Sequence, residues 1–220
     1  MEEVLLIDKP KGWTSFDVVG KIRSQLSKQA GHRVKVGHAG TLDPLATGLL
    51  IVLVGKATKQ QDSFMKQDKV YEVTMKLGQT STTADEEGEK TAVSSRKPTQ
   101  SELSEALMAF TGTISQVPPA YSAIKIDGQR AYKLARAGKD VKIEPRQVTI
   151  YDITDVTYEY PHVSFTTKVS SGTYIRSLVT DIGDKLGTGA YMTDLRRTQI
   201  GHFSIEAAEE LDDGQAIDIT

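Results

Sequence analysis

The sequence has no cysteine among its 220 residues, which excludes disulfides, thiolate metal ligands and thiol nucleophiles. Its four histidines are scattered and show no metal-ligand spacing, so no structural zinc site is expected. No apolar run approaches the ~18 residues of a membrane span. The N-terminus carries acids where a signal peptide would carry bases. We therefore expect a cytoplasmic protein with no metal and no membrane contact.

Common phosphate-binding and hydrolase motifs are also missing. There is no GxGxxG and no GxSxG. The glycines of GLLIVLVGKAT have the wrong spacing for a phosphate-binding loop, and Ala57 replaces the Mg²⁺-binding Ser or Thr. The acidic stretch DEEGEK lacks the alternating oxygen ligands of a calcium loop. No cofactor is expected.

Charge is unevenly distributed along the chain. The net charge is −2, but residues 205–220 carry six acids and no Lys or Arg. The remainder therefore has 27 bases against 23 acids, a net charge of +4. Because counterion release depends on where the bases lie, the acidic total does not exclude a nucleic-acid partner.

Residues 119–147 form the most basic stretch, with seven bases against three acids and two interleaved tyrosines. Bases can bind phosphates and aromatic rings can stack on unpaired bases, so this stretch is a candidate RNA-facing arm. The alternative is a solvated helix-and-loop surface, and composition alone does not separate the two. The bases considered for RNA contact are Lys125, Arg130, Lys133 and Arg136.

The first half of the chain alternates strand and helix patterns. VLLID (4–8) predicts a strand, and Thr14 with Asp17 predicts the capped start of a helix whose apolar residues are Phe16, Val19, Ile22 and Leu26. A Gly-rich loop over 31–48 leads into the strand-like LLIVLVG. YEVTMKLG (71–78) alternates as a strand does, and STTADEEGEK (81–90) is typical of a solvated turn.

In the second half, Thr99 and Glu102 predict a second capped helix. Two strand patterns follow within 148–170, and 173–187 predicts a helix that ends at Gly187. The helices interrupt the strands too irregularly for a doubly wound sheet. The prediction is a mixed α/β fold.

One carboxylate stands apart, in GHAGTLDPLATGLL (37–50). Asp43 is the only Asp or Glu of this loop, which enters an apolar run. Most Asp-Pro pairs are simple turns, and local composition favours that reading for Asp43-Pro44. However, the small residues on either side leave room for a bulky group to approach the backbone.

The loop resembles the signature of the bacterial tRNA pseudouridine-55 synthase (TruB-type) family, G-[ST]-L-D-P-x-A-x-G, whose Asp is catalytic. Further stretches match family motifs in the same order from about residue 4 to about 204. They are DKPKGWTS, KVYEVTMKLG, TTADEEG, PPAYSAIKIDGQRAYKLARAG, SSGTYIRSL and DLRRTQIGHF. The departures are mild: Ala39 stands where many members have Thr, and Leu-Ile follows the second Gly in place of Leu-Pro.

The resemblance implies a pseudouridine-synthase fold: an α+β domain with a mixed, mostly antiparallel central sheet flanked by helices. It implies one catalytic domain over 1–220, with a thumb-loop insertion at about 119–147 and an acidic end at 205–220. The usual C-terminal RNA-binding domain is expected to be absent.

The resemblance also implies an isomerase that converts uridine 55 in the T-loop of tRNA to pseudouridine by base flipping. The expected protein is a monomer that needs no cofactor. Asp43 would be the catalytic carboxylate, either attacking C1′ or assisting a route through a glycal. Arg176 would pair with Asp43, because a neighbouring guanidinium favours an ionised carboxylate.

The remaining residues of the site come from the same resemblance. Tyr71 would stack on the flipped base and move a proton at C5, and His38 would contact the nucleotide. Tyr174 and Leu195 would close the pocket. Without the family, Tyr71, Tyr174 and Leu195 would be taken as core residues and His38 as an ordinary loop histidine.

Three other functions compete with this one. An RNA-binding module would not need a carboxylate at position 43. A glycosidase-like hydrolase would use Asp43 as nucleophile, but no second carboxylate has an independent claim to be its acid or base. A synthase acting on another uridine would share the same motifs.

Overall fold

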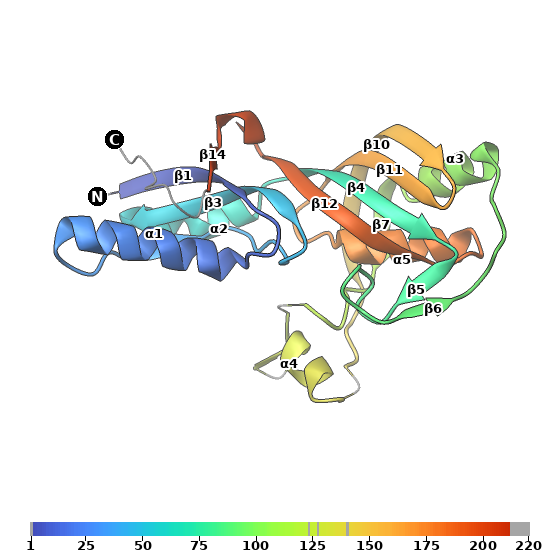
Figure 1. The fold of residues 1–220 in the computed structure, drawn as a ribbon, viewed down its shortest axis with the longest axis horizontal. Coiled ribbons are helices and arrows are strands. Elements are labelled where there is room, and N and C mark those ends of the chain that lie inside the picture. The colour runs from blue at the N-terminus through green and yellow to red at the C-terminus, as the bar shows by residue number, and fades with distance from the viewer. Residues whose placement is uncertain (1, 123, 127, 140, 212–220) are drawn as a thin grey trace. The chain divides into compact units, whose positions relative to one another are not determined.

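The computed structural model describes residues 2–122, 124–126, 128–139 and 141–211. The chain forms two compact units, Met1–Glu72 with Leu195–Thr220 (unit 1) and Val73–Asp194 (unit 2). Two strands, β4 (Lys69–Leu77) and β12 (Ala190–Ile200), run from one unit into the other (Figure 1). The expected single domain over 1–220 remains a prediction.

Unit 1 is built around three long strands and one long helix. Its strands follow the order β14–β1–β3–β12, with β2 on β3 and β13 on β12. Strand β1 is antiparallel to β3, whereas β3 and β12 are parallel. Its elements are β1 (Glu2–Lys9), α1 (Ser15–Ala30), β2 (Val36–His38), β3 (Thr47–Gly55), η1 (Lys56–Gln60), α2 (Gln61–Met65), β13 (Phe203–Ser204), η2 (Ile205–Ala207) and β14 (Glu209–Glu210).

Strand β3 is buried on both faces, which explains its unbroken apolar sequence. Leu50, Val52 and Val54 belong to one core cluster, together with apolar residues of α1. Leu49, Ile51 and Leu53 belong to a second cluster on the other face. The strand that follows the Asp43 loop is therefore the most deeply packed element of unit 1.

Unit 2 contains the strand order β12–β4–β11–β10–β7 and two separate two-stranded sheets, β5–β6 and β8–β9. Strand β10 is antiparallel to both β7 and β11. Its elements are β5 (Gln79–Ser81), β6 (Lys90–Ala92), α3 (Gln100–Met108), β7 (Gly112–Gln116), β8 (Lys125–Ile126), β9 (Gln129–Arg130), α4 (Ala131–Arg136), β10 (Arg146–Glu159), β11 (His162–Val169) and α5 (Ile175–Lys185).

The mixed fold with a mostly antiparallel sheet and flanking helices is confirmed. Both predicted capping boxes form, at Thr14 for α1 and at Thr99 for α3. Helix α5 ends at Lys185, and Gly187 takes a left-handed φ of 67° just beyond it.

The prediction for α1 is wrong at Phe16, which is 67% exposed. The buried stripe is formed by Val18, Val19, Ile22 and Leu26, and Phe16 lies outside it. Its ring instead meets the ring of His38 edge-on, at 5.4 Å between centroids.

Within the described ranges, no helix is both long enough and apolar enough to span a membrane.

Candidate active site

The loop that carries Asp43 lies in unit 1, between β2 and β3. Asp43 is half-buried, and its neighbours Leu42 and Leu45 are buried. The carbonyl of Asp43 accepts a hydrogen bond from the N–H of Ala46 at 3.0 Å, which closes a tight turn. Apolar side chains therefore anchor the turn on both sides of the carboxylate.

The segment that leads into α1 holds this turn. Ser15 is buried, and its hydroxyl accepts from the N–H of Leu42 at 2.9 Å and donates to the carbonyl of Leu42 at 3.1 Å. The N–H of Gly12 donates to the carbonyl of Pro44 at 2.8 Å. Both residues adjoining Asp43 are thus fixed by hydrogen bonds from one short segment.

Lys9 is a buried cation beneath the same turn. Its ammonium donates to the carbonyls of Trp13 (2.7 Å), Pro10 (2.9 Å) and Pro44 (3.4 Å). Burial lowers the pKa of Lys9 from 10.5 to about 8, while the charge of Asp43 acts in the opposite direction and favours the ammonium. Because a Coulombic interaction is mutual, Lys9 in turn favours the ionised carboxylate of Asp43.

Arg197, on β12, donates hydrogen bonds to both ends of the Asp43 loop. Its Nε donates to the carbonyl of Leu49 at 2.8 Å and its Nη2 to that of Gly40 at 3.1 Å, and the side chain is almost fully buried. Gly48 has a φ of 101°, and a Cβ there would lie 2.3 Å from the Arg197 carbonyl oxygen. Only glycine allows β3 and β12 to approach this closely.

Three more of the predicted site residues lie in unit 1. His38 ends β2 and is half-buried, and its carbonyl accepts from Nε2 of Gln61 at 2.9 Å. Tyr71 on β4 and Leu195 on β12 are each 7% exposed. Their predicted contacts with a nucleotide stay predictions.

Arg176 and Tyr174 lie in unit 2, at the start of α5. The Arg176 guanidinium is buried and pairs with Asp85, with 3.3 Å between Nη1 and Oδ2. It also donates to the carbonyls of Thr83 (3.2 Å) and Tyr121 (2.8 Å). The predicted pairing of Arg176 with Asp43 stays a prediction, because these residues belong to different units.

Asp85 is the partner of the predicted site residue Arg176, and the sequence reasoning missed it. The stretch 81–90 was expected to be solvated, but Asp85 is 3% exposed. Its Oδ1 accepts from the N–H of Glu87 at 3.1 Å and from the hydroxyl of Thr83. Nothing in the sequence separates Asp85 from the neighbouring glutamates, since its partner Arg176 lies 91 residues further along the chain.

Lys9, Ser15 and Arg197 were missed for the same reason. They lie in the motifs DKPKGWTS and DLRRTQIGHF, which mark the family but do not show what each side chain contacts. Their hydrogen bonds to the Asp43 loop become visible only in the folded chain.

The basic arm (residues 119–147) belongs to unit 2 and carries the β8–β9 hairpin and α4. In Figure 1 it projects from the rest of its unit as a separate loop. Arg130 and Lys133 are exposed, as an RNA-contacting role requires. The side chains of Lys125 and Arg136 lie outside the described part of the structure.

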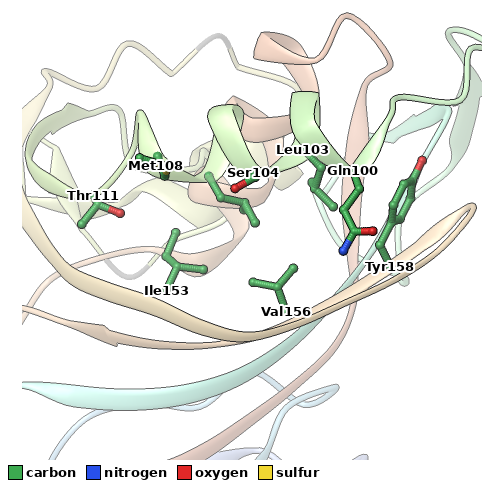
Figure 2. Close-up of a pocket in the computed structure, with 9 residues that line it drawn as sticks. Gln100, Leu103, Ser104, Met108, Thr111, Ile153, Val156 and Tyr158 are labelled. Carbon is green, nitrogen blue, oxygen red and sulfur yellow. The ribbon is translucent and has the colours of Figure 1, made fainter.

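A cavity of about 210 Å³ lies elsewhere in unit 2, between α3 and β10 (Figure 2). Leu103 and Met108 face Ile153 and Val156 across it. None of the predicted site residues lines this cavity. Nor do the described residues contain a group of three His, Asp or Glu side chains arranged to hold a metal ion.

Comparison with known proteins gives two family matches. Residues 27–175 match the TruB family pseudouridylate synthase (N-terminal domain), and residues 176–218 match the tRNA pseudouridylate synthase B C-terminal domain.

Curated relatives are similar over nearly the whole chain. A protein of Parabacteroides distasonis named tRNA pseudouridine synthase B is 45% identical over 96% of this chain and 92% of its own length. A protein of the same name from Clostridium novyi is 48% identical over 96% of this chain and 71% of its own length.

Solved structures show the same fold. A chain in the crystal structure of a Cbf5-Nop10-Gar1 complex matches 94% of this chain with a TM-score of 0.71 and 32% identity. A chain in the structure of an H/ACA RNP bound to a substrate RNA containing 2′-deoxyuridine matches with a TM-score of 0.67 and 29% identity. This chain spans about half the length of each of them, 52% and 50%.

The predicted fold, the family match over residues 27–175 and the similarity to these relatives agree. The chain belongs to the TruB family of pseudouridylate synthases, and is an isomerase.

Proposed function

We propose that the chain isomerises uridine 55 in the T-loop of tRNA, with Asp43 as its catalytic carboxylate. The observation that carries this proposal is the fixed Asp43 loop, which Lys9, Ser15 and Arg197 hold by hydrogen bonds to its backbone. A carboxylate held in this way can act at one atom of a bound nucleotide without reorganising.

The reaction keeps all atoms of the uridine. The bond from N1 to C1′ breaks, the base turns, and C5 bonds to C1′. C5 then loses its hydrogen and N1 gains a proton, so no oxidant, reductant or cofactor is consumed. Asp43 contributes either by attacking C1′ or by assisting loss of the 2′ proton, and both routes need its ionised form.

The other predicted residues have roles around the flipped base. Tyr71 stacks on it, which contributes about 1–3 kcal/mol per base. Tyr71 also moves the proton at C5. His38 contacts the nucleotide, and Tyr174 and Leu195 close the pocket. Arg176 pairs with Asp43 and keeps it ionised, while Asp85 holds the Arg176 guanidinium.

RNA is the partner that the charges favour. Arg130 and Lys133 are exposed on the basic arm, and folded RNA is recognised through shape, phosphates and unpaired bases. The relatives named tRNA pseudouridine synthase B and the neighbour solved with a substrate RNA support the same substrate class.

The experiment is tritium release from a T-arm stem-loop labelled with [5-³H]uridine. Wild type should release tritium, because C5 loses its hydrogen when it bonds to the sugar. Asp43→Asn should release none while still binding the RNA. Release by the variant at the wild-type rate would exclude Asp43 as the catalytic carboxylate.

The same assay separates the competing functions. Tight binding without tritium release by wild type would indicate an RNA-binding module. Free uracil among the products would indicate a hydrolase. Substitution of the uridine at position 55 alone, leaving other uridines labelled, tests whether that uridine is the target.

A further inference from the structure

The root of the basic arm is a single pair of residues in the sheet. Gln116 ends β7 and Arg146 begins β10, and the two are register partners. The chain leaves the sheet after Gln116 and returns at Arg146. A displacement of the arm is therefore transmitted to the sheet through this pair. Figure 1 shows the arm departing from this part of unit 2.

The side chain of Gln116 is fully buried and makes two complementary hydrogen bonds to one residue. Its Oε1 accepts from the N–H of Tyr174 at 2.8 Å, and its Nε2 donates to the carbonyl of Tyr174 at 3.1 Å. An asparagine side chain is one methylene shorter, and an ionised glutamate has no donor. The geometry is therefore specific for glutamine.

Tyr174 is the N-cap residue of α5, and its own side chain makes no capping hydrogen bond. Its carbonyl also accepts the first helical hydrogen bond, from the N–H of Leu178 at 3.1 Å. The Gln116 amide therefore fixes the point at which α5 begins, two residues before Arg176.

Two further hydrogen bonds connect the first turn of α5 to the outgoing end of the arm. The hydroxyl of Ser177 donates to the carbonyl of Val117 at 2.8 Å, and the Arg176 guanidinium donates to the carbonyl of Tyr121 at 2.8 Å. A shift of the segment 117–121 would break these bonds unless α5 moved with it. Breaking them would take the acceptor from the buried Ser177 hydroxyl and one acceptor from the Arg176 guanidinium.

We propose that Gln116 is a positioning residue that couples RNA held by the basic arm to the placement of Tyr174 and Arg176. RNA on the arm fixes the arm's root, and the Gln116 amide passes that constraint to the start of α5. Gln116 itself touches no reacting atom. This inference rests on the proposed function, in which the arm binds RNA and Tyr174 and Arg176 serve the reaction.

The first test is Gln116→Met, which keeps the length of the side chain and removes both hydrogen bonds. At saturating T-arm stem-loop we expect turnover about tenfold lower, because the N–H of Tyr174 loses its Gln116 partner, while its carbonyl keeps the hydrogen bond from Leu178. The Kd for the RNA should stay within about twofold, since Gln116 is buried away from solvent. Wild-type turnover in a folded Gln116→Met protein would overturn the proposal.

Thr167→Val is the matched control. Thr167 is fully buried in the same unit, and its hydroxyl donates to the carbonyl of Asp152 at 2.7 Å, on strands β11 and β10. This variant also loses a buried hydrogen bond, but that bond joins β11 to β10 and involves no residue of α5 or the arm. Its turnover should equal that of wild type. An equal loss of turnover in both variants would reduce the effect of Gln116 to general destabilisation and overturn the proposal.

A double-mutant cycle tests the coupling itself. Arg130→Ala with Lys133→Ala weakens the arm's hold on RNA. In that background Gln116→Met should lower turnover less than threefold, because the constraint that Gln116 passes on is already weak. An unchanged tenfold effect would show that Gln116 acts only locally.

Gln116→Glu provides a test that does not depend on Gln116→Met folding. A protonated glutamic acid offers one donor and one acceptor, as the amide does, whereas the ionised form offers acceptors alone. The ratio of variant to wild-type turnover should therefore rise as the pH falls from about 8 to about 5.5, through the raised pKa expected of a buried carboxyl. A flat ratio would contradict the proposal.

Wild-type tritium release in the same assays separates this inference from the function on which it rests. If wild type releases no tritium, the proposed reaction fails. If wild type turns over and the variants behave like it, only the coupling fails.

Discussion

Two buried cations, Lys9 and Arg197, direct their donors at backbone carbonyls around the Asp43 loop. Hydrogen bonds from charged donors stabilise more than neutral ones, at about 1.5–3 kcal/mol each. Lys9 also interacts favourably with the charge of Asp43. Lys9 thus combines two effects, holding the loop in place and favouring the ionised carboxylate, whereas Arg197 holds the loop.

Lys9→Met tests whether Lys9 is buried as a charged group. The pKa of Lys9 is lowered to about 8 in the folded protein from 10.5, so between these values the unfolded chain binds more protons. The free energy of unfolding of wild type should therefore rise as the pH increases from about 8 to about 10.5. In Lys9→Met this rise should be smaller, and urea unfolding at several pH values measures it.

Part of the rise should persist in the variant, because burial also lowers the pKa of Lys69 to about 8. A second variant, Lys69→Met, should lose the share of this rise in the free energy of unfolding that comes from Lys69. Identical pH dependence in wild type and Lys9→Met would contradict the burial of a charged Lys9.

Asp85→Ala tests the buried ion pair of unit 2. The variant removes a buried carboxylate from the Arg176 guanidinium, and breaking such a pair destabilises by about 3–5 kcal/mol. Turnover should fall as well, because the Arg176 guanidinium would lose one of the partners that fix its position. Denaturant unfolding and tritium release measure the two effects.

Glu86→Gln is the control for Asp85→Ala. Glu86 is the next residue and is half-exposed, with 3.8 Å between its carboxylate and the ammonium of Lys90. A surface pair of this kind contributes less than about 1 kcal/mol. Equal destabilisation by both substitutions would argue against a special role for Asp85.

At the scale of elements, the parallel contact between β3 and β12 depends on the absence of a side chain at Gly48. Arg197 pairs with Gly48, where a Cβ would overlap the Arg197 backbone. Gly48→Ala should therefore destabilise the protein. Strain at a φ of 101° costs about 1–3 kcal/mol, and the steric overlap adds to this cost. Chemical denaturation gives this value.

Gly20→Ala serves as its counterpart within unit 1. Gly20 lies inside α1, where an added Cβ meets no atom within 4 Å. Alanine is the better helix former, so this change should stabilise by about 0.5–1 kcal/mol. Opposite signs for the two substitutions would show that the effect at Gly48 comes from its backbone conformation and its contact with β12, not from the added methyl group itself.

At the scale of the whole molecule, the net charge of −2 does not reveal the basic arm, which we propose binds RNA. Substituting Arg130→Ala and Lys133→Ala should weaken tRNA binding and lower the slope of log K against log salt by about 1 for each phosphate that the arm no longer neutralises. Lys28→Ala, at the exposed end of α1, should leave the slope unchanged. An unaltered slope in the arm variant would exclude the arm as a phosphate-binding surface.

Sequence patterns predicted the elements well where the signal was local. The capping boxes at Thr14 and Thr99 and the alternation from Tyr71 to Leu77 concern neighbours in the chain, and all three formed. The resemblance of the motifs to those of the TruB-type family predicted the fold and the family. Strand β12 was not predicted, because its polar sequence gives no periodic signal.

The supporting residues of the site could not be predicted in the same way. Lys9, Asp85, Gln116 and Arg197 act through partners that lie 35 to 157 residues away in the sequence. A buried lysine or aspartate cannot be told from an exposed one by its neighbours in the chain. The roles of these residues follow from tertiary contacts alone.

The chain leaves the sheet for the arm and returns to it at one rung, the pair Gln116 and Arg146. Consequently, residues can be added to the arm or removed from it without shifting any other rung of the ladder between β7 and β10. Loop-closure entropy changes slowly with length, by about 0.6 kcal/mol for each doubling. The arm is therefore a segment whose length can differ between related enzymes while the ladder between β7 and β10 stays the same.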